Sequence, residues 1–147
     1  MILAIDPGNT HAALVRLDER RIYGHDYLPN DEALKVVRSC SCDLIAIEMI
    51  ACYGMPVGVE VFDTCRWIGR YEQIAPAPVR LVYRKEVKIH LCNSMKANDA
   101  SIRQALIDRY GPGKVAAIGT KKSPGPLYGF HGDEWAALAI GVTALRT

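Results

Sequence analysis

The sequence, 147 residues long, contains no apolar segment approaching the roughly 20 residues that a membrane-spanning helix needs. It shows no basic leader and no apolar run long enough for a signal peptide, so we expect neither secretion nor membrane insertion. No internal repeat and no low-complexity segment is visible, and half of the residues are hydrophobic, as in a globular chain. The expectation is a cytoplasmic protein with one domain over residues 1–147.

Cysteine offers little support for a disulfide framework or a zinc site. The five cysteines are an odd number at irregular spacing, which favours reduced thiols. Cys40 and Cys42 lie close together, but no second Cys or His pair follows at the spacing of a zinc finger. We therefore expect small, partly buried side chains rather than metal ligands.

The net charge of +2 is too small to indicate nucleic-acid binding by itself. The charge is unevenly distributed, because residues 84–122 contain nine basic and three acidic residues, which leaves a net −4 for the rest of the chain. Such a basic segment is typical of a surface that follows phosphates, and equally of a solvated charged face. Charge alone does not separate these two interpretations.

Apolar runs and helical periodicity predict an initial hairpin followed by alternating strands and helices. Strands are expected at residues 2–5, 12–17, 21–28, 43–47 and 78–83, and helices at 59–75, 85–92 and 135–145. Two further helices are expected to begin at side-chain caps provided by Asn30 and Asn98. Residues 111–130, rich in glycine and proline, predict a long flexible connection of a kind that is usually functional. This order implies an α/β fold in which helices cover both faces of a mixed sheet.

Acidic residues stand at the ends of two expected strands. Asp6 follows the apolar run 2–5, and Glu48 follows the run 44–47. Strand ends in such sheets open onto the crevice where ligands bind, so the two carboxylates should share one space if their strands are neighbours. A divalent cation would relieve their repulsion, and Asp133 or Glu134 at the start of the last helix would complete the cluster. Two such ions can activate water and stabilise the leaving oxygen of a phosphodiester.

Each acid also has a purely structural interpretation. Asp6 precedes a Pro-Gly turn, where Asp is common, and Glu48 could be an ordinary edge residue. Asp133 and Glu134 could interact with the dipole of the final helix. The combination of two acids after apolar strands and a third before an apolar helix favours the metal-binding interpretation.

Three segments resemble motifs of the RuvC family of Holliday-junction resolvases, in the family's order and across nearly the whole chain. Residues 2–10, Ile-Leu-Ala-Ile-Asp-Pro-Gly-Asn-Thr, resemble the opening strand, where an apolar run meets Asp-Pro-Gly. Residues 44–48, Leu-Ile-Ala-Ile-Glu, resemble the second acidic motif, and residues 136–140, Ala-Ala-Leu-Ala-Ile, resemble the Ala-rich final helix. The length and the segment 54–73 are more similar to phage-encoded relatives than to the cellular enzyme.

The resemblance implies an RNase H-like fold with a mixed five-stranded sheet, a homodimer, Mg²⁺ or Mn²⁺ dependence, no organic cofactor, and symmetric nicking of four-way junctions. It carries Asp6 and Glu48 over as catalytic metal ligands. For the third ligand, His131 and Glu134 keep a three-residue spacing of the family, whereas aligning the Ala-rich helix without a gap favours Asp133. We predict Asp133, with His131 and Glu134 as alternatives. His131 could also orient the water or protonate the leaving oxygen.

The resemblance also indicates positions that contact DNA. The expected DNA-binding residues are Tyr53, Lys85, Lys88, Lys96, Lys121 and Lys122. The tyrosine lies in a loop where the family presents a stacking aromatic, and the next three lysines lie where it has basic residues beside the active site. The last two lysines belong to a basic loop suited to backbone phosphates. Phe62, Trp67 and Tyr71 are interpreted as core or dimer-interface residues.

Three other functions are compatible with the sequence. The first is a YqgF-like nuclease of the same fold that acts on RNA. The second is an actin-like protein that binds ATP, because the Asp-Pro-Gly-Asn-Thr turn resembles its first phosphate-binding turn, although no second copy of that turn is visible. The third is a junction-binding module without catalysis.

Overall fold

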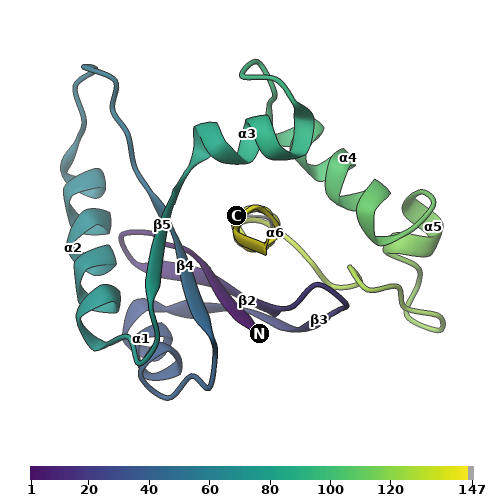
Figure 1. Ribbon diagram of the computed structural model, residues 1–147, viewed down its shortest axis with the longest axis horizontal. Coiled ribbons are helices and arrows are strands. Elements are labelled where there is room, and N and C mark those ends of the chain that lie inside the picture. The colour runs from purple at the N-terminus through teal and green to yellow at the C-terminus, as the bar shows by residue number, and fades with distance from the viewer. Residues whose placement is uncertain (146–147) are drawn as a thin grey trace.

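The computed structural model describes residues 1–145, and Figure 1 shows how its elements are arranged. The strands are β1 (Ile2–Asp6), β2 (His11–Leu17), β3 (Ile22–Pro29), β4 (Leu44–Met49) and β5 (Val79–Tyr83). The helices are α1 (Asn30–Arg38), α2 (Val59–Ile74), α3 (Arg84–Cys92), α4 (Asp99–Tyr110), α5 (Lys114–Ala117) and α6 (Glu134–Leu145). Within these residues no helix is both long and apolar enough to cross a membrane.

The five strands form one mixed sheet in the order β3-β2-β1-β4-β5. β2 pairs antiparallel with both β1 and β3, as expected of consecutive hairpins. β4 pairs parallel with both β1 and β5, and the chain makes these crossovers through α1 and α2. The carboxyl ends of β1, β4 and β5 therefore meet at one edge of the sheet.

Both faces of the sheet are covered, and the alternation of side chains divides the core into two clusters. On β1, Ile2 and Ala4 pack toward α6, whereas Leu3 and Ile5 pack toward α1 and α2. α6 lies between the sheet and the pair α3 and α4 (Figure 1), and its apolar sequence reflects burial on nearly all sides. Because the alternation continues beyond Ile5, the side chain of Asp6 is directed to the α6 face.

The final helix approaches the sheet closely at Gly141. A Cβ atom added there would lie 2.5 Å from Cδ2 of Leu17 and 3.0 Å from Cβ of Ala4. A larger side chain would push α6 away from the strands or force the core to repack. The absence of a side chain at this position thus sets how near the middle of α6 comes to the sheet.

Asn30 does not cap α1 as the sequence suggested. Pro29 occupies the cap position and makes no side-chain cap hydrogen bond. The buried Asn30 side chain instead donates from Nδ2 to the carbonyl oxygen of Gly8 at 2.9 Å and accepts from the Tyr71 hydroxyl at 2.7 Å. It therefore ties the turn after Asp6 to α1 and α2, a role that depends on contacts distant in sequence. The cap predicted at Asn98 is present, since its side chain accepts from a backbone N–H of α4.

The segment 111–130 has more regular structure than a flexible connection. It contains α5 and an isolated bridge between Gly119 and Pro124. The backbone N–H of buried Leu127 donates to the carbonyl of Ala117 at 2.8 Å, which fastens the second half of the segment to α5. The prediction of a long flexible connection was wrong in part, because glycine and proline also build tight, hydrogen-bonded turns.

The cysteines differ in part from the expectation of reduced thiols. The structure pairs Cys40 with Cys42 as a disulfide between α1 and β4, so the expectation was wrong for this pair. Cys52, Cys65 and Cys92 are free, as expected. An odd number of cysteines does not exclude one local pair, whose Cα atoms here lie 5.6 Å apart.

Candidate active site

Asp6 and Glu48 lie side by side at the carboxyl edge of the sheet. β1 and β4 run parallel with Ile5 opposite Ile47, so the next residue of each strand carries the acid. Both carboxyl groups face the same pocket, and they share a hydrogen bond. The structure therefore brings together two residues that are far apart in the sequence.

The surroundings of Asp6 favour its protonated form. Burial raises the pKa of Asp6 to about 9, helped by the hydrogen bond and charge of Glu48 and by the charge of Asp133, while Arg84 opposes the rise. The protonated form of Asp6 is therefore the favoured one at neutral pH in the metal-free protein. Carboxyl pairs with strongly perturbed pKa values concentrate at functional sites.

A pocket of about 480 Å³ opens between the sheet edge, α6 and the helices α3 and α4. We call it the carboxylate pocket, because Asp6, Glu48 and Asp133 line it together. Asp133 comes directly before α6, and its charge is close enough to raise the pKa of Asp6. The three acids predicted as metal ligands therefore meet in one cavity, although their role as ligands stays a prediction.

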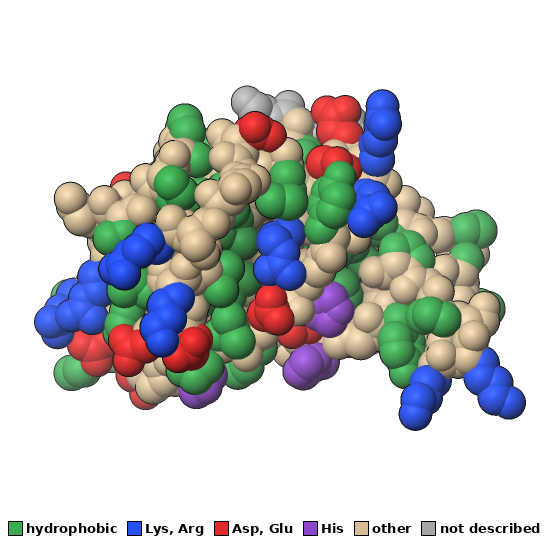
Figure 2. All heavy atoms as spheres, turned by 90° about the horizontal axis from the view of Figure 1, so that it is seen from below, with side chains coloured by type: hydrophobic (Ala, Val, Ile, Leu, Met, Phe, Trp, Pro, Cys, Tyr) green, Lys and Arg blue, Asp and Glu red, His purple; other side chains and the backbone are tan. Residues whose placement is uncertain are grey.

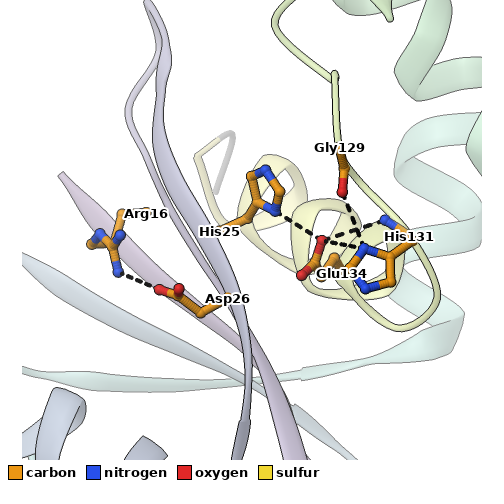
Figure 3. Close-up of polar contacts among 6 residues, drawn as sticks. All are labelled: Arg16, His25, Asp26, Gly129, His131 and Glu134. Atoms are coloured by element: carbon orange, nitrogen blue, oxygen red, sulfur yellow. Dashed lines mark hydrogen bonds and ion pairs between the residues drawn. The ribbon is translucent and has the colours of Figure 1, made fainter. Parts of the chain in front are cut away.

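The alternative third ligands do not line the carboxylate pocket, and Figure 3 shows that Glu134 instead contacts both His131 and His25. Glu134, the first residue of α6, is only 2% exposed, and its Oε1 accepts a hydrogen bond from His25 Nδ1 at 2.8 Å. The side chain of His131 is 75% exposed, and its Nδ1 lies 3.3 Å from the same oxygen. Within residues 1–145, Asp133 is thus the acid at the start of α6 that faces the strand-end pair.

The carboxylate pocket has the donor chemistry of a Mg²⁺ or Mn²⁺ site. Carboxylate oxygens are the ligands that these hard cations prefer. Glu48 and Asp133 both raise the pKa of Asp6 through their charges, so the pocket concentrates negative charge that a divalent cation would offset. In the described part of the chain, no group of three or more His, Cys, Asp or Glu side chains is already arranged to hold an ion. Binding would therefore require the hydrogen bond between Asp6 and Glu48 to open.

Arg84 is a site residue that the sequence analysis did not single out. It is the first residue of α3, directly after β5, and its positive charge lowers the pKa of Asp6. Its guanidinium also pairs with the exposed Asp99 at the start of α4. Arg103 lies over the ring of Trp135, 4.5 Å from its centroid, on another wall of the pocket. The available signal was a basic residue directly after a strand that ends at the same edge as the acids.

A second pocket, of about 250 Å³, adjoins the first along Glu48 and Arg84. We call it the basic pocket, since Lys85, Lys88 and Tyr53 line it. Tyr53 is 73% exposed and has a left-handed backbone with φ of 52°. Three of the predicted DNA-binding residues thus surround one cavity next to the acids.

The remaining predicted DNA-binding lysines lie outside both pockets. Lys96 is exposed in the loop before α4. Lys121 and Lys122 are exposed in the turn that follows α5, at one end of the molecule in Figure 1. On the face shown in Figure 2, basic side chains stand in separate groups, with acidic and histidine side chains between them. The structure therefore divides the predicted DNA contacts between the basic pocket and more distant lysines.

No family model and no curated protein matches the sequence, but solved structures match the fold. RuvC of Thermus thermophilus matches with a TM-score of 0.66 and 18% identity over 97% of this chain and 91% of that chain. The same RuvC in complex with a Holliday junction substrate gives 0.66 and 18%, over 97% and 90%. The fowlpox virus resolvase, in complex with Holliday junction DNA, gives 0.55 and 8% over 99% of both chains. The predicted RNase H-like fold is confirmed: this chain has the mixed five-stranded sheet flanked by helices that RuvC has.

Proposed function

We propose that this protein is a metal-dependent endonuclease that resolves four-way DNA junctions. The observation that carries the proposal is the meeting of Asp6, Glu48 and Asp133 in one pocket beside Arg84. The fold supports the same activity, because two similar structures hold Holliday junction DNA. The match in fold extends over almost the whole of this chain and of both resolvases, so the proposal concerns the complete activity.

The three acids would hold Mg²⁺ or Mn²⁺ through carboxylate oxygens. A pair of such ions held by these acids would supply Lewis-acid activation of water and charge stabilisation of the leaving oxygen of the phosphodiester. Arg84 stands between the two pockets, where its guanidinium can bind a non-bridging phosphate oxygen of the scissile group. We do not place Glu134 or His131 among the ligands, since both lie outside the carboxylate pocket.

The basic pocket would hold the strand next to the scissile phosphate. Lys85 and Lys88 can neutralise phosphates there, which positions the strand without reading its sequence. The exposed ring of Tyr53 can stack on a base left unpaired at the crossover, an interaction worth about 1–3 kcal/mol. Lys96 would extend the basic surface beyond the pocket.

The proposal is tested by a cleavage assay on four-way, three-way, flap and linear DNA, with Mg²⁺, Mn²⁺ or EDTA. We expect paired nicks in the four-way junction that depend on the divalent ion. In parallel assays with an RNA substrate and with ATP, cleavage confined to RNA would support the YqgF-like alternative, and ATP hydrolysis without cleavage would support the actin-like one. Tight junction binding without cleavage under every metal condition would leave only the binding module.

Lys121 and Lys122 are expected to contribute to affinity through phosphates distant from the active site. Replacing both with Ala should weaken junction binding and lower the slope of log K against log salt by about 1 for each phosphate that is no longer neutralised. Fluorescence anisotropy at several salt concentrations measures this slope. Lys35→Ala, which removes an exposed lysine of α1 paired with Glu32, is the matched control and should leave the slope unchanged. An unchanged slope in the double variant would remove this turn from the DNA surface.

We also propose that the protein acts as a homodimer, with the outer face of α2 in the interface. Val59 and Phe62, three residues apart on this helix, are 73% and 61% exposed, and adjacent exposed apolar side chains are typical of an interaction surface. Phe62→Glu should shift the protein to a monomer in sedimentation velocity, because a charge would be buried in the interface. Glu72→Gln, exposed at the other end of α2, serves as the control. A wild-type protein that sediments as a monomer at assay concentration would contradict the dimer.

A further inference from the structure

We infer that His25 is a positioning residue for the carboxylate pocket: through Glu134 it fixes the orientation in which Asp133 enters that pocket. The inference rests on the proposed function, because it concerns a ligand of the proposed metal site. The contact that motivates it is the hydrogen bond between His25 of β3 and Glu134 at the start of α6, two residues that lie 109 positions apart in the sequence.

Glu134 has a specific set of partners that a buried carboxylate requires. Among the buried residues of the described chain it is the only Asp or Glu, and it is 2% exposed. Its Oε1 accepts from His25 Nδ1 at 2.8 Å and from the backbone N–H of His131 at 3.3 Å (Figure 3). A buried carboxylate without partners is strongly unfavourable, so these hydrogen bonds determine where the Glu134 side chain points.

His25 is itself held on a rigid element. It lies within β3, where it pairs in register with Val15 of β2. Its ring stacks on Phe130 with 4.1 Å between ring centroids. A Cβ atom at Gly129 would lie 3.6 Å from Cε1 of the same ring, so the chain before α6 passes directly beside it. The sheet thus provides a fixed point to which the residues before α6 are fastened.

The orientation of Glu134 has a direct consequence for its neighbour. Successive residues at the start of a helix point about 100° apart, since a turn contains 3.6 residues. With Glu134 directed to His25 on β3, Asp133 is directed toward the ends of β1 and β4, where it lines the carboxylate pocket. Without the hydrogen bond from His25, the first turn of α6 could rotate and move Asp133 away from Asp6.

The three-residue spacing of His131 and Glu134 brings the two residues into contact. His131 contacts Oε1 of Glu134 through its backbone N–H and its Nδ1, and this contact lies outside the carboxylate pocket. Groups that orient a metal ligand without touching the metal commonly change affinity by about 10–100-fold when they are removed. His25 and Glu134 would act in this way on Asp133.

The experiment measures Mn²⁺ affinity by electron paramagnetic resonance, without DNA, in variants of His25. His25→Leu removes the donor and should weaken Mn²⁺ binding by about tenfold. His25→Asn should retain near-wild-type affinity, because its Nδ2 occupies the position of the imidazole Nδ1. His25→Gln places its amide one bond further from the backbone, so this variant should bind Mn²⁺ less tightly than His25→Asn. The difference in Mn²⁺ affinity between the Asn and Gln variants tests the inference even if His25→Leu does not fold.

Asp26→Asn is the matched control, because Asp26 is the next residue of β3 and pairs with Arg16 on the other side of the strand (Figure 3). It should leave Mn²⁺ affinity unchanged. Wild-type affinity in both His25→Leu and His25→Gln, or equal weakening in the Asn and Gln variants, would overturn the positioning role while the proposed nuclease stands. A wild-type protein that binds no Mn²⁺ would overturn the proposed metal site and this inference together.

Discussion

Asp6→Asn is expected to abolish Mg²⁺-dependent cleavage of four-way junctions and, at the same time, to stabilise the metal-free protein. The loss of cleavage follows from the loss of a carboxylate oxygen at the proposed metal site. The gain in stability follows from removing an acid that folding buries beside Glu48 and Asp133. Residues selected for catalysis are often unfavourable for stability in this way. Junction binding should persist, since the basic pocket is unchanged.

The gain in stability should depend on pH in a defined direction. The pKa of Asp6 is raised from 3.8 to about 9 by folding, so the folded state binds the proton more tightly than the unfolded state. The metal-free wild type should therefore lose stability as pH rises from about 4 to about 9, and Asp6→Asn should lack this loss. Water at the open side of the pocket reduces the effect, so we expect about 1–3 kcal/mol at pH 7.

Urea unfolding in EDTA at several pH values measures the stability, and the junction assay in Mg²⁺ measures the cleavage. Asp108→Asn is the control for loss of an acid, because Asp108 is an exposed residue of α4 whose side chain accepts a hydrogen bond from Gln104. It should change neither readout. Full cleavage by Asp6→Asn would refute the assignment of Asp6, whatever its stability.

The second large expected effect is a difference in cleavage between substitutions of two adjacent acids, Asp133 and Glu134. Asp133→Asn should reduce cleavage to background and, in EDTA, leave stability equal or higher, because Asp133 adds repulsion to the Asp6 pair. Glu134→Gln should retain cleavage, because its amide oxygen can still accept the hydrogen bond from His25. Glu134→Leu cannot accept it and should lose about 1–3 kcal/mol of stability, since the histidine donor is left unsatisfied.

Single-turnover cleavage and urea unfolding of the three variants test this division. If Glu134→Gln lost cleavage as fully as Asp133→Asn while remaining folded, Glu134 would be the ligand and the observed orientation would change on metal binding. If Asp133→Asn cleaved at the wild-type rate, the third ligand would have to be sought among other residues of the pocket.

The architecture was largely predictable because its signals are local. Apolar runs before Asp6 and Glu48 mark strands that are buried on both faces, and Asn98 marks a helix start by a hydrogen bond to its own helix. The predictions failed where a residue uses partners distant in the chain. Asn30 is of a residue type that often caps helices, but its side chain forms hydrogen bonds with Gly8 and Tyr71. No local sequence pattern reveals these two partners.

The candidate site was predictable in part for the same reason. The strand-end acids followed from the patterns of β1 and β4, because parallel neighbours end at one edge. Arg84 was missed, because its position directly after a strand points to the site only once α3 is placed over the sheet edge. The separation of Lys121 and Lys122 from the basic pocket likewise depends on where α5 lies.

By itself, the sequence determined the order of the strands and of the helices other than α5, and the two acids at the ends of β1 and β4, because periodicity and strand ends are properties of neighbouring residues. Only the tertiary structure decided which of the two acids at the start of α6 lies in the same pocket as Asp6 and Glu48. Asp133 and Glu134 are adjacent and chemically alike, and the choice depends on a histidine 109 residues away that binds one and leaves the other to the pocket. A hydrogen bond over that distance exists only once the sheet and α6 have packed.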